Sequence, residues 1–324
     1  MSNPLPSPVR PLNVGNVVSA GLVLYRSNLK QYFLIAIKAN LWFLPAVFAA
    51  LALYFSFLSL LFRSFSSILS ANGSLPPSLG PLFQIVGRFS AIAPLLIPIL
   101  LFIVLYCNAK YLANSALISR LAYQEMANQP ESASDAGKKV YPRMWTFFLA
   151  GLEVGLRLFG LYFLFSFAGG IVAGVLSVGS RSPLNQSPIF IVIIIAAILG
   201  LVWYYTRWSI SEVPLAVETE LSSSQGVQRS WDLTATAVGR VQLIVFVAFL
   251  VTIPIQAITN YLPSYFLRLI PANSFAFWIV YIVNILISLL GGVIVLPFWQ
   301  SIKAVMYYDL RSRREGIDLQ LRDR

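Results

Sequence analysis

Six long apolar stretches alternate with polar segments along the chain. They centre near residues 41–62, 91–118, 146–178, 188–210, 241–262 and 275–298. Each can cross a hydrocarbon core of about 30 Å as a helix that rises about 1.5 Å per residue. We therefore expect an all-α, polytopic membrane bundle of six transmembrane helices. They would form three hairpin units, each preceded by an interfacial helix on the cytoplasmic side.

The charged residues divide the polar segments into two sets. Connectors 63–90, 179–187 and 263–274 contain no Asp or Glu, whereas the other polar segments hold most Lys and Arg and every acid except Glu153. Lys and Arg near the spans mark the cytoplasmic side of a membrane protein. We therefore expect an integral, multi-pass protein with both termini in the cytoplasm.

The length favours a single integral membrane domain over residues 1–324. Within it we expect a cytoplasmic tail and interfacial helix at 1–30, a six-span bundle at 31–306 and a cytoplasmic tail at 307–324. The first apolar run begins too far into the chain to resemble a cleavable signal peptide.

Composition narrows the expected partners. The chain is 58% hydrophobic and 11% charged, with a formal net charge of +11. Excess positive charge near the spans favours anionic lipid headgroups, and no basic stripe alternates with exposed aromatics as in a nucleic-acid-binding protein. We expect the lipid bilayer as partner, with a second membrane protein or a second copy of the chain as further candidates.

Two absences limit the chemistry that we expect. The chain contains no histidine, which is the commonest metal ligand and the commonest general base. Cys107 is the single cysteine, so no internal disulfide can form. We expect no metal and no cofactor.

A similar polar segment precedes each odd-numbered span, at residues 16–30, 134–143 and 224–240. Each is interpreted as a short helix in the membrane interface, although any helix beside a membrane has a similar pattern. Ser222 and Gln225 predict a capping box for the third helix. The apolar face expected for that helix holds Val227, Trp231, Thr234 and Val238. The face expected for the first helix holds Val14, Val17, Gly21 and Leu24.

Three parts of the chain carry a resemblance to a known family. They are residues 213–218 with 226–234 (VPLAVE and GVQRSWDLT), residues 307–319 (YYDLRSRREGIDL), and residues 10–15 with 24–28 (RPLNVG and LYRSN). Together they resemble the membrane-domain family named after glycerophosphoryl diester phosphodiesterases. The resemblance implies a six-span module of largely unassigned function. It does not imply phosphodiesterase activity, because in that family the hydrolase is a separate soluble domain that this sequence does not contain.

Glu153 and Arg157 form a candidate intramembrane polar pair. They lie four residues apart, so they share a helix face and can pair. An ion pair inside the bilayer is costly and marks a functional site by default. If the third span instead begins at Leu158, the pair lies in the headgroup zone. The pair could also lock two helices together.

Polar residues at the ends of the first two spans form a candidate cytoplasmic vestibule. They are Lys38, Asn40, Asn108, Lys110 and Asn114. The alternative is hydrogen bonding between helices near the membrane surface, which is common for such residues.

The third span and the tail offer two further candidates. Gly151 with Gly155 and Gly170 with Gly174 have the spacing that lets a neighbouring helix approach closely. The candidate docking residues of the tail are Asp309, Arg311, Arg313 and Arg314. In the tail, Asp309 and Arg313 are predicted to pair at a spacing of four. The alternative for the tail is a solvated, lipid-touching end.

The sequence offers no catalytic constellation and no phosphate-binding or metal motif. We therefore expect a non-enzymatic membrane module that acts as a scaffold, assembly factor or accessory subunit of a membrane complex. The alternative is a transporter or channel for lipid or a small solute.

Overall fold

The computed structural model describes residues 13–72, 80–177, 188–271 and 274–315. Those residues are mostly helical and include no strand. Six helical stretches are long and apolar enough to cross a membrane, which confirms the expected all-α polytopic class. The outer parts of two resembling segments, residues 10–12 and 316–319, lie outside the described residues.

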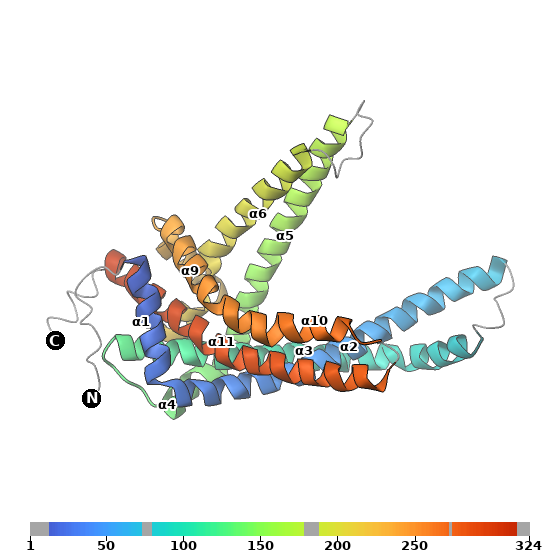
Figure 1. The fold of residues 1–324 in the computed structure, drawn as a ribbon, viewed down its shortest axis with the longest axis horizontal. Helices are drawn as coiled ribbons and strands as arrows, with labels where there is room; N and C mark the ends of the chain where they lie inside the picture. Colours follow the sequence, from blue (N-terminus) through green and yellow to red (C-terminus); the bar gives the residue numbers. More distant parts are fainter. Residues whose placement is uncertain (1–12, 73–79, 178–187, 272–273, 316–324) are drawn as a thin grey trace. The chain divides into compact units, whose positions relative to one another are not determined.

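The elements of Figure 1 are numbered in their order along the chain. They are α1 (Val14–Ser27), α2 (Leu29–Asn72), α3 (Gly80–Met126), α4 (Ala133–Val140), η2 (Tyr141–Arg143), α5 (Met144–Ser177), α6 (Pro188–Trp208), α7 (Glu212–Val217), α8 (Ser223–Thr234), α9 (Val238–Gln256), η4 (Ala257–Tyr261), α10 (Leu262–Arg268) and α11 (Phe275–Glu315).

The chain divides into two compact units. The smaller unit, residues 37–112, holds most of α2 and α3, which pair through aromatic side chains. The rings of Trp42 and Tyr106 meet edge to face at 5.8 Å between centroids, and those of Phe43 and Tyr111 lie 6.1 Å apart. The larger unit comprises residues 1–36 and 113–324.

Helix α11 is the central element of the larger unit. Many side chains in its first half are exposed, including Phe275, Ile282 and Leu290. Its second half is buried on nearly every side from Pro297 to Leu310. The first half therefore has the character of a membrane span, and the second half forms the core of a protein layer at the end of that span.

The two best-defined interfacial-helix predictions both fall on helices. In α1, Val17, Gly21 and Leu24 of the expected apolar face are buried, and the helix packs on α11 and α9 (Figure 1). A Cβ atom added to Gly21 would lie 2.6 Å from Cδ1 of Ile302. The apolar face of α1 is therefore covered by protein.

Helix α8 begins with the expected capping box between Ser222 and Gln225. It ends at Thr234, and Val238 begins α9, so Val238 lies beyond the helix whose face it was expected to share. The physical reason is that the chain turns at residues 235–237 to enter the next span, so a single helix cannot continue through them. The second segment forms α4, which Ser132 caps by accepting a hydrogen bond from the amide of Asp135.

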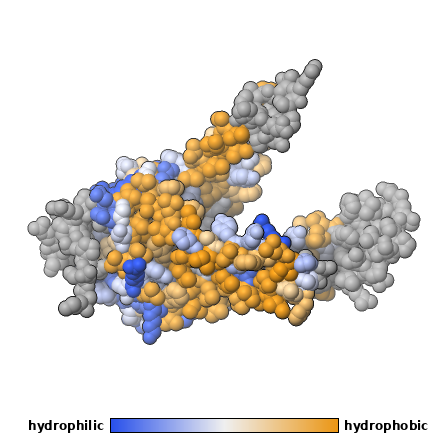
Figure 2. Space-filling view, viewed as in Figure 1, coloured by the Kyte–Doolittle hydropathy of each residue, from blue (hydrophilic) through white to orange (hydrophobic). Residues whose placement is uncertain are grey.

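Helices α5 and α6 form an antiparallel hairpin with little covering (Figure 1). The two helices approach closely where Cβ atoms added to Gly200 and Gly169 would meet Phe165 and Ile193. Outward side chains such as Phe163 are more than half exposed. Figure 2 shows hydrophobic residues along this hairpin, whereas hydrophilic residues gather over α1 and α4.

Candidate functional site

Most buried charges of the larger unit lie in one helical layer, which we call the platform. It comprises α1, residues 113–126 of α3, α4, α7, α8 and residues 297–315 of α11. Two arginines hold α7 within it. Nη1 of Arg120 donates to the carbonyl oxygen of Ala216 at 2.6 Å, and Nη1 of Arg143 donates to that of Leu215 at 2.8 Å. These bonds satisfy carbonyls that the end of a helix leaves without intrahelical partners.

Glu131 balances the charge of Arg120. Its Oε2 accepts a hydrogen bond from Nε of Arg120 at 2.7 Å, and its Oε1 pairs with Nζ of Lys139 at 2.5 Å. Burial raises the pKa of Glu131, but the hydrogen bonds and charges of the two cations outweigh burial and hold that pKa below its ordinary value. Glu131 is therefore ionised at neutral pH.

Glu218 joins three segments that are distant in sequence. Its Oε1 accepts from the hydroxyl of Tyr307 at 2.5 Å and lies 3.3 Å from Nη2 of Arg229. Nη1 of Arg311 lies 3.7 Å from the same carboxylate. Glu315 pairs with both arginines and completes the cluster. One carboxylate therefore ties α7 to α8 and to α11.

The tail residues expected to dock a partner make contacts within the larger unit. Asp309 is buried and pairs with Arg240 at 2.9 Å and with Arg313 at 3.1 Å, which confirms the predicted spacing-of-four pair. Arg311 donates to Tyr123 at 3.2 Å, and Arg314 donates to the carbonyl of Asp232. Docking of a partner on the tail stays a prediction.

A second set of polar side chains joins α3 to α11 through hydrogen bonds. Oγ of Ser119 donates to Oε1 of Gln300 at 2.5 Å, and Nε2 of Gln300 donates to Oγ of Ser115 at 2.5 Å. All three side chains are buried. Both the oxygen and the nitrogen of the Gln300 side-chain amide therefore have hydrogen-bond partners.

The candidate vestibule residues fall in both units. Lys38, Asn40, Asn108 and Lys110 belong to residues 37–112, and Asn114 belongs to the larger unit. Nδ2 of Asn108 donates to the carbonyl of Val104 on its own helix at 2.8 Å, and Lys110 lies 5.5 Å from the ring centre of Tyr106. Oδ1 of Asn114 accepts from the hydroxyl of Tyr141 at 3.0 Å. A vestibule lined by these residues stays a prediction.

Glu153 and Arg157 pair on α5, at the spacing that the sequence predicts. Their side chains are 24% and 42% exposed, so the cation is the more accessible partner. The guanidinium of Arg157 also lies 5.5 Å from the ring centre of Trp208, the last residue of α6. The pair therefore lies where the hairpin joins the platform.

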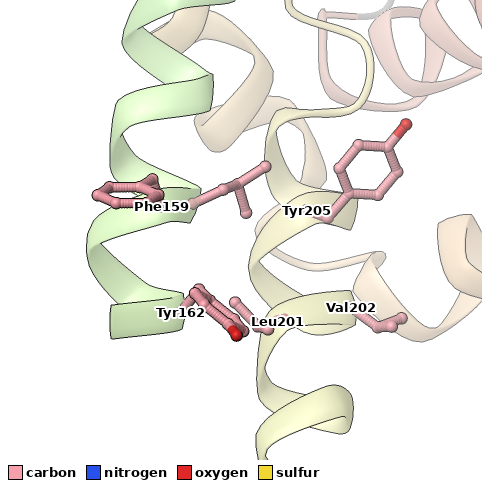
Figure 3. A pocket seen from close by; sticks show the side chains of 6 residues that line it. Phe159, Tyr162, Leu201, Val202 and Tyr205 are labelled. Atoms are coloured by element: carbon pink, nitrogen blue, oxygen red, sulfur yellow. The ribbon is translucent and has the colours of Figure 1, made fainter. Parts of the chain in front are cut away.

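An apolar groove begins beside this pair. Its cavity of about 410 Å³ opens between α5 and α6, and aliphatic and aromatic side chains line it. In Figure 3, Tyr162 of α5 and Leu201 of α6 lie side by side between the two helices. The lining residues are Leu158, Phe159, Tyr162, Leu201, Val202 and Tyr205. This groove could not be predicted from the sequence, because its residues have the pattern of ordinary lipid-facing positions.

Fold and site together define an integral, multi-pass, all-α membrane protein with a polar helical layer at the end of its spans. No family model, curated protein or solved structure matches the chain.

Proposed function

We propose that this chain is a non-enzymatic integral membrane module that acts as a scaffold, assembly factor or accessory subunit of a membrane complex. The observation that carries the proposal is the use of the platform's charges. Glu131, Glu218 and Asp309 are each paired with two cations, and each carboxylate thereby reaches at least one other helix. Carboxylates held in this way join helices into one layer and suit a structural role.

The exposed hairpin supports a role in assembly. Gly155 and Gly170 are exposed on α5, and a Cβ atom added to either would meet no neighbouring atom within 4 Å. Small residues let transmembrane helices approach closely, so this surface suits a partner helix.

The test is the mass of the full chain after gentle extraction. Native mass spectrometry in mild detergent should detect a stoichiometric complex with another membrane protein or a second copy. Gly170→Leu should dissociate that complex, whereas Gly239→Leu should preserve it, because Gly239 is also exposed and lies outside the hairpin. A lone monomer in several mild detergents would contradict the proposal.

We further propose that both termini face the cytoplasm and that the chain is a member of the glycerophosphoryl diester phosphodiesterase membrane-domain-like family. Support for the orientation is the distribution of Lys and Arg. Support for the family is that two of its resembling parts meet. Glu218 and Arg229 belong to one part, Tyr307 belongs to another, and all three share one cluster. An alignment of homologues tests the membership, since these three positions should then vary together.

Transport of a lipid or small solute is the second candidate. The apolar groove, with a charged pair at one end, favours it. The test is transbilayer movement of fluorescent lipid in vesicles that contain the purified chain. Movement no faster than in protein-free vesicles would exclude lipid transport.

A further inference from the structure

The Glu153–Arg157 pair lies at one end of the groove, and the apolar lining residues follow it along both helices of the hairpin. On α5, Arg157 directly precedes Leu158, and Tyr162 follows about 8 Å further along the helix. On α6, Tyr205 and Leu201 precede Trp208, which lies under the guanidinium of Arg157. A charged pair at one end of an apolar groove matches the layout of a lipid, in which a polar headgroup is attached to an acyl chain.

We propose that this groove is a binding site for one molecule of phosphatidylglycerol. One acyl chain lies along Tyr162 and Leu201, the phosphate contacts Arg157, and a glycerol hydroxyl donates to Glu153. This site is independent of the proposed scaffold role.

The pair retains the hydrogen-bonding capacity that such a headgroup needs. Only Nη2 of Arg157 donates to Glu153, through Oε1. Across the described part of the chain, Nε and Nη1 of Arg157 donate no hydrogen bond, and Oε2 of Glu153 accepts none. A guanidinium binds phosphate oxygens through two parallel N–H groups, and an ionised carboxylate only accepts. The pair can therefore receive a phosphate and a hydroxyl side by side.

Charge and hydrogen-bonding capacity together favour phosphatidylglycerol over phosphatidylcholine and phosphatidylethanolamine. Phosphatidylcholine has no N–H or O–H group in its headgroup and cannot donate to Glu153. Phosphatidylethanolamine can donate, but its headgroup has no net charge and gains little from a chain of net charge +11. Phosphatidylglycerol has both a net negative charge and hydroxyl donors. Arg157, the more exposed partner, presents its cation to that charge first.

The experiment measures lipid binding to the full chain in detergent by native mass spectrometry. Phosphatidylglycerol, phosphatidylethanolamine and phosphatidylcholine with identical acyl chains are titrated separately. We expect a one-to-one complex with phosphatidylglycerol whose Kd is about tenfold lower than that with phosphatidylcholine, the factor expected for one charge-assisted hydrogen bond.

Two variants and two matched controls locate the site. Arg157→Gln should raise the Kd for phosphatidylglycerol about tenfold, and Leu201→Trp should raise it at least as much by filling the groove. Lys138→Gln breaks an exposed ion pair elsewhere, and Leu199→Trp enlarges an exposed side chain of α6 outside the groove. Both controls should bind phosphatidylglycerol as the parent chain does.

Several outcomes would overturn the site. They are equal Kd values for phosphatidylglycerol and phosphatidylcholine, an unchanged Kd in Leu201→Trp, or equal effects of Arg157→Gln and Lys138→Gln. Binding of phosphatidylethanolamine as tight as that of phosphatidylglycerol would overturn the choice of lipid. If Arg157→Gln does not fold, Arg157→Lys replaces it. Lysine lacks the planar pair of donors, so an unchanged Kd in that variant would also count against the site.

Discussion

The side chain of Arg120 is only 4% exposed, and two of its nitrogens donate hydrogen bonds to oxygen atoms. Nε bonds Glu131, and Nη1 bonds the carbonyls at the end of α7. These hydrogen bonds replace the hydration that the buried guanidinium loses. Arg120 therefore joins α3 to α7 and to the segment before α4.

We expect Arg120→Gln to destabilise the protein by about 3 kcal/mol, because it leaves the largely buried Glu131 with one cation fewer and the α7 carbonyls without a donor. Thermal unfolding in detergent, followed by circular dichroism, measures the effect. Lys138→Gln is the control, since an exposed pair contributes about 0 to 1 kcal/mol. Similar melting temperatures for the two variants would show that Arg120 does not hold the platform.

Glu131 gives the stability of the platform a dependence on pH. Its pKa is held below the ordinary value, so its contribution is complete above the ordinary pKa and is lost as pH falls through the lowered one. We expect the melting temperature to fall between about pH 5 and pH 3. Glu131→Gln should melt lower at neutral pH and show a smaller fall over this range. An identical pH profile in the variant would exclude Glu131 as the group responsible.

Residue pairs close in sequence could be predicted, and distant ones could not. Glu153–Arg157, Asp309–Arg313 and the Ser222–Gln225 capping box follow from helical spacing alone. By contrast, Glu218 and Tyr307 lie 89 positions apart, and nothing in their local sequence indicates that they meet. Such pairs depend on how the helices pack.

At the scale of elements, the seating of α1 on α11 depends on Gly21. A Cβ atom there would lie 2.6 Å from Cδ1 and 3.2 Å from Cα of Ile302. We expect Gly21→Ala to destabilise this contact by about 1 to 3 kcal/mol through overpacking. Faster hydrogen exchange in α1 would report the loss.

Gly15 provides the control for Gly21 within the same helix. A Cβ atom at Gly15 meets nothing within 4 Å, so Gly15→Ala should stabilise α1 by up to about 1 kcal/mol through helix propensity. If both substitutions slow hydrogen exchange in α1 equally, the close approach of Gly21 to Ile302 contributes nothing to the stability of α1.

Hydropathy predicted the existence of all six spans, but it did not predict where the helices end. The first apolar stretch was placed near 41–62, whereas α2 extends from Leu29 to Asn72. A helix satisfies its own backbone hydrogen bonds, so it can continue past the apolar stretch on both sides. The burial of α1 under protein was equally hidden, because an apolar helix face looks the same whether lipid or protein covers it.

At the scale of the whole molecule, the expected orientation can be tested with two single cysteines in a Cys107→Ala background. A membrane-impermeant maleimide applied to intact cells should label Ser182→Cys. It should not label Glu220→Cys, which replaces an exposed residue after α7. The physical reason is the excess of Lys and Arg on the platform side.

Permeabilised cells provide the control for the labelling experiment, because both cysteines should then react. Labelling of Glu220→Cys alone in intact cells would place the platform outside and reverse the orientation.

Helix α11 has a mechanical consequence for the larger unit. Its 41 residues extend about 60 Å, roughly twice the thickness of a hydrocarbon core, so one element is both span and platform core. A change in the inclination of the span, as when bilayer thickness changes, must therefore be accommodated within this one helix or passed on to the layer that it carries. Pro297 lies between the two halves of α11 and lacks a backbone N–H. Bending therefore concentrates at Pro297, which makes this residue the hinge between the span and the platform.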